Sequence, residues 1–282
     1  MKEFSQKTFF LVILCWLSAA LMAQQPTGSN SKQAQPAGKR VPQAKTHPEF
    51  NDYNAAYATA GGAAAEKAAN EFAAKYPTSE LKAYLYAKAM HEYQNENNPE
   101  KMLSVGEKVL RVDPDNSIAL VLTATVLADS LSDSDTDRQA KIARTTKNAT
   151  HALETVDSGF VPPPNATAEQ VTAYKSTLRS MAHSALGIVS LKTGDDAGAE
   201  KELRLSADLN QGQPDPYIWY HLALAQDHQK KYSDALESVN HSLRVMGTNA
   251  DLGNLAKGEQ GRLLTLTGGA SSSQKAPAQS PK

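Results

Sequence analysis

The chain has 282 residues, 40% of them hydrophobic, and a formal net charge of −1 at pH 7. This length accommodates one or two domains or one elongated repeat domain, and the lack of a basic excess disfavours nucleic acid as a partner. The one cysteine, Cys15, lies in an apolar N-terminal run, so a chain that has lost this run would carry neither a thiol nor a disulfide.

The first 23 residues predict a secretory signal peptide. Lys2 and Lys7 precede an apolar run from Thr8 to Ala23, as they do in export signals. The run is short for a stable transmembrane helix, which needs roughly 20 residues. We expect cleavage after Ala23, with the small residues 18–20 as a second site. The expected product is a periplasmic or secreted protein of a bacterial cell envelope, with no stable membrane span in its mature form.

Low-complexity segments flank the predicted folded region. Residues 24–46 are rich in Gln, Pro, Ser, Gly and Lys and predict a disordered linker, and residues 268–282 predict a disordered tail. The region between them, residues 47–267, lacks the alternating pattern of strands and predicts a helical repeat domain.

Short interruptions divide this region into helices. Three of them are KYPTSE at 75–80, VLRVDPDN at 109–116 and QPDPYIWY at 213–220. Proline lacks an N–H group and disfavours a helical conformation in the preceding residue, so it ends a helix. Asp and Asn accept hydrogen bonds from the free N–H groups that begin the next helix. The interruptions therefore predict short helices joined into hairpins.

A proline run, Pro162–Pro164, interrupts the region a fourth time. A longer helix is predicted after it, beginning near Thr167, which forms a capping box with Gln170. The sequence leaves two interpretations open. Either a break at residues 158–166 divides the array into two lobes, or the long helix is an extended first helix of a hairpin.

The last predicted hairpin, Trp219–Gly247, carries a repeat pattern. Trp219, Leu222 and Ala223 share one face of its first helix, and Ala235 lies on the second helix. An earlier copy aligns Leu186 with Leu222, an offset of 36 residues (222 − 186). The pattern resembles the tetratricopeptide repeat, a helix–turn–helix unit of about 34 residues.

Looser copies precede these two, and their matching residues are Ala65, Ala69, Phe72 and Pro77 in one copy and Tyr86, Tyr93, Met102, Val109 and Pro114 in the next. Residues 118–129 and 140–156 predict a further pair of helices. The resemblance implies an all-α fold, a right-handed superhelical solenoid of stacked helical hairpins with about four or five repeats. It also places Ala235 at a close contact between helices. The alternative is an ordinary all-α bundle.

The sequence contains no recognisable catalytic or metal-binding motif. It has no Gly-x-Ser-x-Gly, no phosphate-binding glycine loop and no His-Glu-x-x-His. Residues 133–137, DSDTD, begin like a calcium loop, but Arg138 and Arg144 occupy the positions that require Gly and Glu. We therefore predict no catalytic residue, no bound metal and no cofactor.

The resemblance implies a concave groove, lined by the first helix of each hairpin, in which a protein or peptide partner binds. The residues at the corresponding positions are the candidate partner-binding residues: Tyr84, His91, Asn95, Ile188, Lys192, Tyr217, Tyr220, Leu224, Asp227 and His228. Their mixture of aromatic, aliphatic and polar side chains suits an extended or helical peptide. Each aromatic has the alternative role of packing against a neighbouring helix.

These features predict an exported, noncatalytic scaffold or adaptor that binds a protein or peptide and helps to assemble or position a complex. The stretch FAAKYPTSELKAYLYAKAMHEY at 72–93 resembles repeats of bacterial envelope-assembly proteins, including outer-membrane barrel-assembly lipoproteins. The alternative function is an enzyme, or an enzyme-associated subunit, with an α-helical site that no motif reveals.

Overall fold

The computed structural model describes residues 39–163 and 166–272. Across these residues the regular structure is α-helical, and the helices are α1 (His47–Tyr57), α2 (Gly62–Lys75), α3 (Lys82–Asn95), α4 (Pro99–Val112), α5 (Ser117–Asp129), α6 (Arg138–Gly159), α7 (Ala168–Thr193), α8 (Asp196–Leu209), α9 (Pro216–His228), α10 (Tyr232–Val245) and α11 (Ala250–Ser272). The predicted all-α fold is confirmed for this part of the chain. The predicted signal peptide and most of the predicted linker and tail lie outside the described residues.

The chain divides into two compact units, unit 1 at residues 1–185 and unit 2 at residues 186–282. The division falls inside α7, whereas the sequence places a break at residues 158–166. The first part of α7 packs within unit 1, where Lys175 and Arg179 donate hydrogen bonds to the Asp157 carboxylate of α6 at 3.2 and 2.7 Å. The last part of α7 belongs to unit 2.

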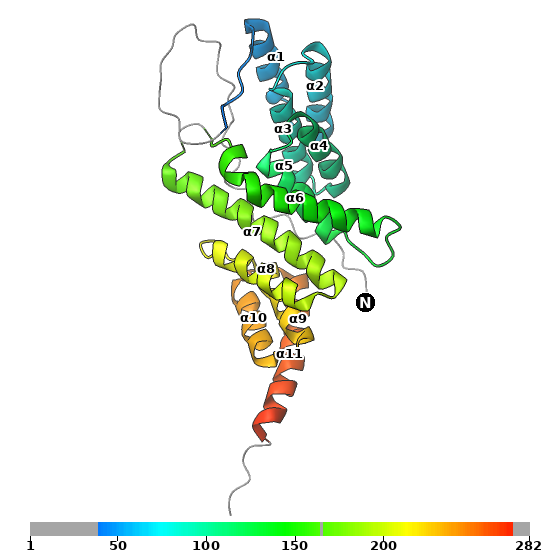
Figure 1. The fold of residues 1–282 in the computed structure, drawn as a ribbon, viewed down its shortest axis with the longest axis vertical. Helices are drawn as coiled ribbons and strands as arrows, with labels where there is room; N and C mark the ends of the chain where they lie inside the picture. The colour runs from blue at the N-terminus through cyan, green and yellow to red at the C-terminus, as the bar shows by residue number, and fades with distance from the viewer. Residues whose placement is uncertain (1–38, 164–165, 273–282) are drawn as a thin grey trace, which may run out of the picture. The chain divides into compact units, whose positions relative to one another are not determined.

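Successive helices of unit 1 pack side by side (Figure 1). α1 packs against α2, and each following pair up to α5 and α6 does the same. Because the links between neighbours are short, consecutive helices run antiparallel and form hairpins. A single hairpin cannot bury its apolar face alone, so each one is stabilised by the next.

The predicted interruption at 109–116 is confirmed. α4 ends at Val112 and α5 begins at Ser117. The side chain of Asn116 accepts a hydrogen bond from the backbone N–H of Ala119 at 3.0 Å, which satisfies one of the free donors at the start of α5. The stop and the restart therefore both follow from local sequence.

Two further helix starts are capped as their sequences predict. Asp215 accepts from the backbone N–H of Tyr217 at 2.8 Å at the start of α9. Before α7, the backbone N–H of Thr167 donates to Gln170 Oε1 at 2.9 Å, and the N–H of Gln170 donates to Thr167 Oγ1 at 3.2 Å. This reciprocal pair is the predicted capping box.

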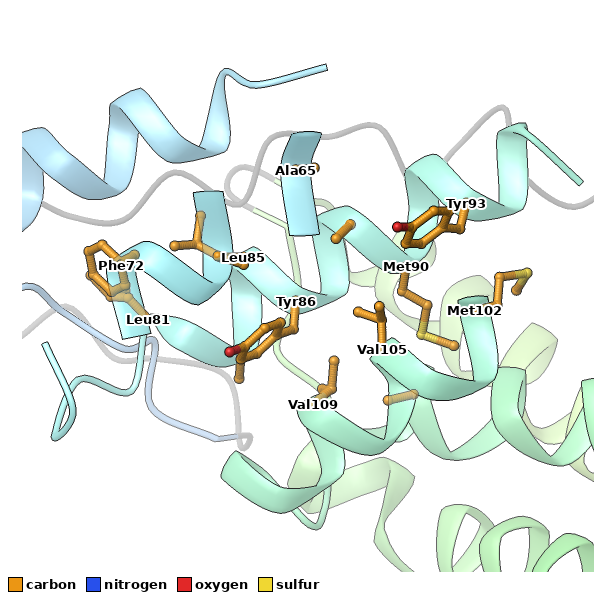
Figure 2. Packing of buried hydrophobic residues seen from close by; sticks show 14 of the residues in the cluster. Ala65, Phe72, Leu81, Leu85, Tyr86, Met90, Tyr93, Met102, Val105 and Val109 are labelled. Carbon is orange, nitrogen blue, oxygen red and sulfur yellow. The ribbon is translucent and has the colours of Figure 1, made fainter. Parts of the chain in front are cut away.

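The core of unit 1 lies between its helices, and Figure 2 shows it around α3 and α4. Met90, Met102 and Val109 are fully enclosed there. Gly106 lets α4 approach α5 closely, since a Cβ atom at this position would lie 2.5 Å from Cγ2 of Thr123. The lack of a side chain at Gly106 is thus matched to a close contact between helices.

In unit 2, α9 packs against α8 and α10, and α10 packs against α11. Ala235 of α10 is 0% exposed and belongs to a cluster with Ala223, Val239 and Leu263. Its predicted place at a close helix contact is therefore confirmed. α11 continues to Ser272, past Thr267, where the sequence predicts the folded region to end.

Residues 39–46, the last part of the predicted disordered linker, precede α1 in the structure. Pro42 and Ala44 are buried, and Ala44 joins the core cluster of unit 1. This part of the predicted disordered linker is therefore packed against the helices. The reason is that its two small apolar side chains are buried against an apolar surface of unit 1, which composition alone does not indicate.

Across the part of the chain that the structure describes, no helix combines the length and the apolar character needed to span a membrane.

Candidate partner-binding site

In unit 1 the candidate residues lie along one side of α3. Tyr84, His91 and Asn95 are separated by seven and four residues, a spacing that places them on the same face of a helix. Tyr84 and His91 are half-buried and Asn95 is exposed. Tyr86 and Tyr93, on the opposite side of α3, are buried in the core. The structure therefore brings the three unit 1 candidates together on an accessible face.

The two ring side chains of this face are neutral near pH 7. Burial raises the pKa of Tyr84, and the nearby carboxylates of Asp113 and Glu80 raise it further. Burial lowers the pKa of His91, although Glu92 acts in the opposite direction. A protonated phenol and a neutral imidazole both retain hydrogen-bond donors, so this face offers polar contacts at low desolvation cost.

In unit 2 the two candidates on α7 differ in accessibility. Ile188 is 2% exposed, so its side chain belongs to the packed interior. Lys192, one turn further along α7, is half-buried. Only Lys192 of this pair presents surface to a partner.

Tyr217, the first candidate on α9, is 8% exposed. Its hydroxyl oxygen accepts a hydrogen bond from Asn249 Nδ2 at 2.9 Å, and Asn249 lies directly before α11. The ring of Tyr217 therefore packs inside unit 2, and its polar end is held by the chain itself. Of the two roles that the sequence leaves open for each aromatic, the structure gives Tyr217 the packing role.

Two more α9 candidates contact α11. Tyr220 packs against the cluster that contains Ala235, and burial, aided by the Glu259 charge, raises its pKa. Asp227 forms an ion pair with Arg262 of α11, which also pairs with Glu259 at 2.8 Å. These contacts join α9 to α11, so Tyr220 and Asp227 serve the packing of unit 2.

The remaining α9 candidates are Leu224 and His228. Leu224 is half-buried and His228 is exposed at the end of the helix. His228 Nδ1 lies 2.8 Å from Asp196 Oδ1 of α8, so His228 faces α8 while Asp227 faces α11. The structure does not bring all the α9 candidates together on one open surface.

Sequence reasoning missed a buried carboxylate in unit 2. Glu200 of α8 is 8% exposed and accepts hydrogen bonds from Arg204 at 2.9 Å, Gln229 at 2.9 Å and Lys231 at 2.6 Å. Burial acts to raise its pKa, but the hydrogen bonds from Lys231, Arg204 and Gln229 prevail and lower the pKa to about 2. The spacing of Glu200 and Arg204 by four residues was the only sequence signal for this network.

The second missed residue is His221 of α9. Its Nδ1 atom is buried, and the backbone of Tyr217, one turn earlier on α9, is its polar neighbour. Burial lowers the pKa of His221 to about 4, and the positive charge of Lys192 lowers it further. Nothing in the spacing of the histidines indicated this environment, because it depends on neighbours from two helices.

No group of three or more His, Cys, Asp or Glu residues that could hold a metal ion occurs within residues 39–163 and 166–272. The acidic residues 133–137 instead pair with nearby cations. Arg138 lies 3.3 Å from Asp133, and Lys141 lies 2.9 Å from Asp135.

No protein-family model and no curated protein matches the chain. Among solved structures, it is similar to a thermophilic tetratricopeptide-repeat protein of Thermus thermophilus, with 14% sequence identity and a TM-score of 0.46. The similarity covers 75% of this chain and 98% of that one.

Proposed function

We propose that this protein is an exported, noncatalytic scaffold of helical hairpins that binds a protein or peptide partner in the bacterial cell envelope. In this role it assists the assembly or positioning of a complex. The observation that carries the proposal is the accessible face of α3, on which Tyr84, His91 and Asn95 lie together.

The chemistry of this face suits a polypeptide. Aromatic rings contribute a large contact area for little loss of side-chain freedom, and such residues are enriched at the centres of interfaces. Neutral Tyr84 and His91 and the amide of Asn95 supply hydrogen-bond donors and acceptors for a partner backbone. The opposite side of α3 is anchored in the core, so the face is held rigidly before a partner arrives.

The localisation rests on sequence. The apolar run at residues 8–23, preceded by two lysines, supports export. A fold that is held by helix packing alone needs no disulfide, so it suits a chain whose only cysteine lies within that run.

The test is capture of a partner from the extracytoplasmic fraction of the native organism, followed by an affinity measurement with the purified partner. His91→Ala combined with Asn95→Ala should weaken binding by about tenfold or more, because an interface anchor is often worth over 1 kcal/mol. The matched control is Lys67→Ala with Glu71→Ala, two exposed positions on α2.

Both variants must keep the helical circular dichroism and the melting temperature of the wild type. Equal binding by the two variants would show that the α3 face is not the partner site. If the purified chain turns over a substrate, and one His or Asp substitution abolishes this activity, the protein is an enzyme and the scaffold proposal is wrong.

A further inference from the structure

The segment before α1 lies on unit 1 in the manner of a bound peptide. From Pro42 to Lys45 its residues are alternately buried and exposed, with Pro42 and Ala44 buried and Gln43 and Lys45 exposed. This two-residue period is that of an extended chain resting on a surface by one side. Figure 1 shows the segment as the blue stretch that leads into α1.

Positive side chains at both ends of the segment contact acceptors on unit 1. Lys39 forms an ion pair with Asp113, which ends α4. Arg40 Nη2 donates to both oxygens of Glu80, at 2.8 and 3.1 Å. These two carboxylates belong to different interhelical turns, so the segment crosses from one hairpin to the next.

The other end of the segment is held by a third acceptor group. Lys45 Nζ donates to the carbonyl oxygen and to Oγ1 of Thr78, at 3.0 and 3.1 Å. Thr78 and Glu80 both lie in the turn between α2 and α3. Each of the three basic side chains of the segment thus contacts an acceptor group on unit 1.

This surface adjoins the candidate partner-binding face. Tyr84, in the first turn of α3, packs against the core cluster that includes Ala44. The charges of Asp113, Glu80 and Arg40 all act on its hydroxyl. The segment therefore lies beside the α3 residue that the proposed function assigns to partner binding.

We infer that Thr78, Glu80, Tyr84 and Asp113 form a docking surface for an extended basic peptide, and that residues 39–45 occupy it within the same chain until a partner segment of like chemistry displaces them. The inference rests on the proposed function only for the existence of a partner. The carboxylates select positive side chains, and the apolar floor accepts small residues such as Pro and Ala at alternate positions.

The contacts suit an exchangeable occupant. The side chains of Arg40 and Glu80 are 64% and 55% exposed, and exposed ion pairs contribute only about 0–1 kcal/mol. Tethering compensates for this weakness, because an attached segment acts at an effective concentration on the order of millimolar. A free peptide should therefore bind well only after the resident segment has been released.

The first experiment measures binding of a fluorescent peptide of residues 38–46, GKRVPQAKT, by anisotropy. Lys39→Ala with Arg40→Ala, in the full chain, removes two anchors of the resident segment. This released variant should bind the peptide about tenfold or more tighter than the wild type. Adding Glu80→Gln and Asp113→Asn to the released variant should abolish this gain in affinity. The control adds Glu71→Gln and Glu100→Gln, which alter exposed carboxylates of α2 and α4, and should keep the gain.

A peptide in which glutamine replaces Lys39 and Arg40 should bind the released variant at least about tenfold more weakly, and added salt should weaken the binding of the basic peptide. Equal binding of the basic and neutral peptides would overturn the inference. Equal binding of the basic peptide by the wild type and the released variant would also overturn it.

A second experiment reports occupancy without any added peptide. Trypsin cleaves after Arg40 and Lys45, and the docked segment should resist it. Glu80→Gln with Asp113→Asn should speed cleavage at both bonds several-fold, while the Glu71→Gln, Glu100→Gln control should leave the rates unchanged. Unchanged rates in the acceptor variant, with wild-type circular dichroism, would show that the segment is not held there.

These results are separable from the partner test. If the peptide binds in a charge-dependent way but the chain captures no partner, the docking surface is supported and the scaffold function is refuted. If partner capture depends on His91 and Asn95 but the peptide does not bind, the scaffold function is supported and the docking surface is refuted.

Discussion

Gly106 shows how a single residue sets the distance between helices. Gly106→Ala should raise helix propensity by about 1 kcal/mol, but its Cβ would lie 2.5 Å from Cγ2 of Thr123 and 3.2 Å from Cε of Met90. Thr123 is fully buried, and its hydroxyl donates to the Ala119 carbonyl at 2.7 Å, so it has little room to move. We expect a net loss of about 1–3 kcal/mol in the free energy of unfolding, measured by urea titration.

Gly258 provides the matched control for this substitution. It is exposed on α11, and no atom lies within 4 Å of a Cβ built there. Gly258→Ala should therefore stabilise the protein by up to about 1 kcal/mol. If Gly106→Ala proved as stabilising as Gly258→Ala, the close approach of α4 and α5 would be refuted.

His221 should make stability depend on pH in a defined window. Its pKa is lowered from 6.5 to about 4 in the folded state, so the unfolded chain binds a proton first as the pH falls. Its contribution is fully present above pH 6.5 and is lost as the pH falls toward 4, by an amount on the order of 1–3 kcal/mol.

The measurement is the free energy of unfolding between pH 8 and 3 for the wild type and His221→Gln, taken by denaturant titration at each pH. The variant should lose less stability between pH 6.5 and about 4, and this difference isolates His221 from the other histidines. Glu200, whose pKa is lowered from 4.5 to about 2, acts in a lower window: its contribution is present above pH 4.5 and is lost as the pH falls through 2. Parallel curves for the two proteins down to pH 4 would contradict the buried environment of His221.

At the scale of elements, α2 depends on α3 for its N-terminal cap. Gly61, with φ of +84°, and Gly62 begin α2 without a capping side chain of their own. The N–H of Gly61 donates to Glu92 Oε2 at 2.9 Å, and the N–H of Gly62 donates to Glu96 Oε1 at 2.6 Å. The carboxylates of Glu92 in α3 and of Glu96 directly after it thus satisfy free donors at the start of α2 and oppose the positive end of its dipole.

Glu96→Ala should therefore destabilise unit 1 by about 0.5–2 kcal/mol, the range found when a capping acceptor is removed. Glu71→Ala is the control, because Glu71 is exposed and its nearest ion-pair partner, Lys67, is 3.9 Å away. The control should change stability by less than about 0.5 kcal/mol. Chemical denaturation of both variants gives the comparison, and equal effects would mean that α3 does not cap α2.

At the scale of the whole molecule, export should remove the apolar N-terminal segment. The run that ends at Ala23 has the length and the preceding lysines of a signal peptide. N-terminal sequencing of the extracytoplasmic protein should begin near Gln24 or Leu21. Recovery of Met1 in that fraction would instead indicate an uncleaved signal anchor.

The sequence by itself determined where many helices begin and end, and which faces they bury. Asn116 and the Thr167–Gln170 pair cap helices through hydrogen bonds within a few residues, so short stretches of chain suffice to predict them. The resemblance of residues 219–247 to a repeat hairpin likewise implied that Ala235 lies at a close contact between helices, and Ala235 is fully buried.

Tertiary structure alone decided which neighbour covers each face. Periodicity aligned Tyr217 with Tyr220 and Leu224. In the folded protein, however, Tyr217 is buried with its hydroxyl bonded to Asn249, and Asp227 pairs with Arg262 of α11. Composition marked residues 39–46 as linker, yet Ala44 is buried in the core cluster of unit 1. Burial and ion pairing join residues far apart in the chain, so they depend on how the helices pack, which no local pattern encodes.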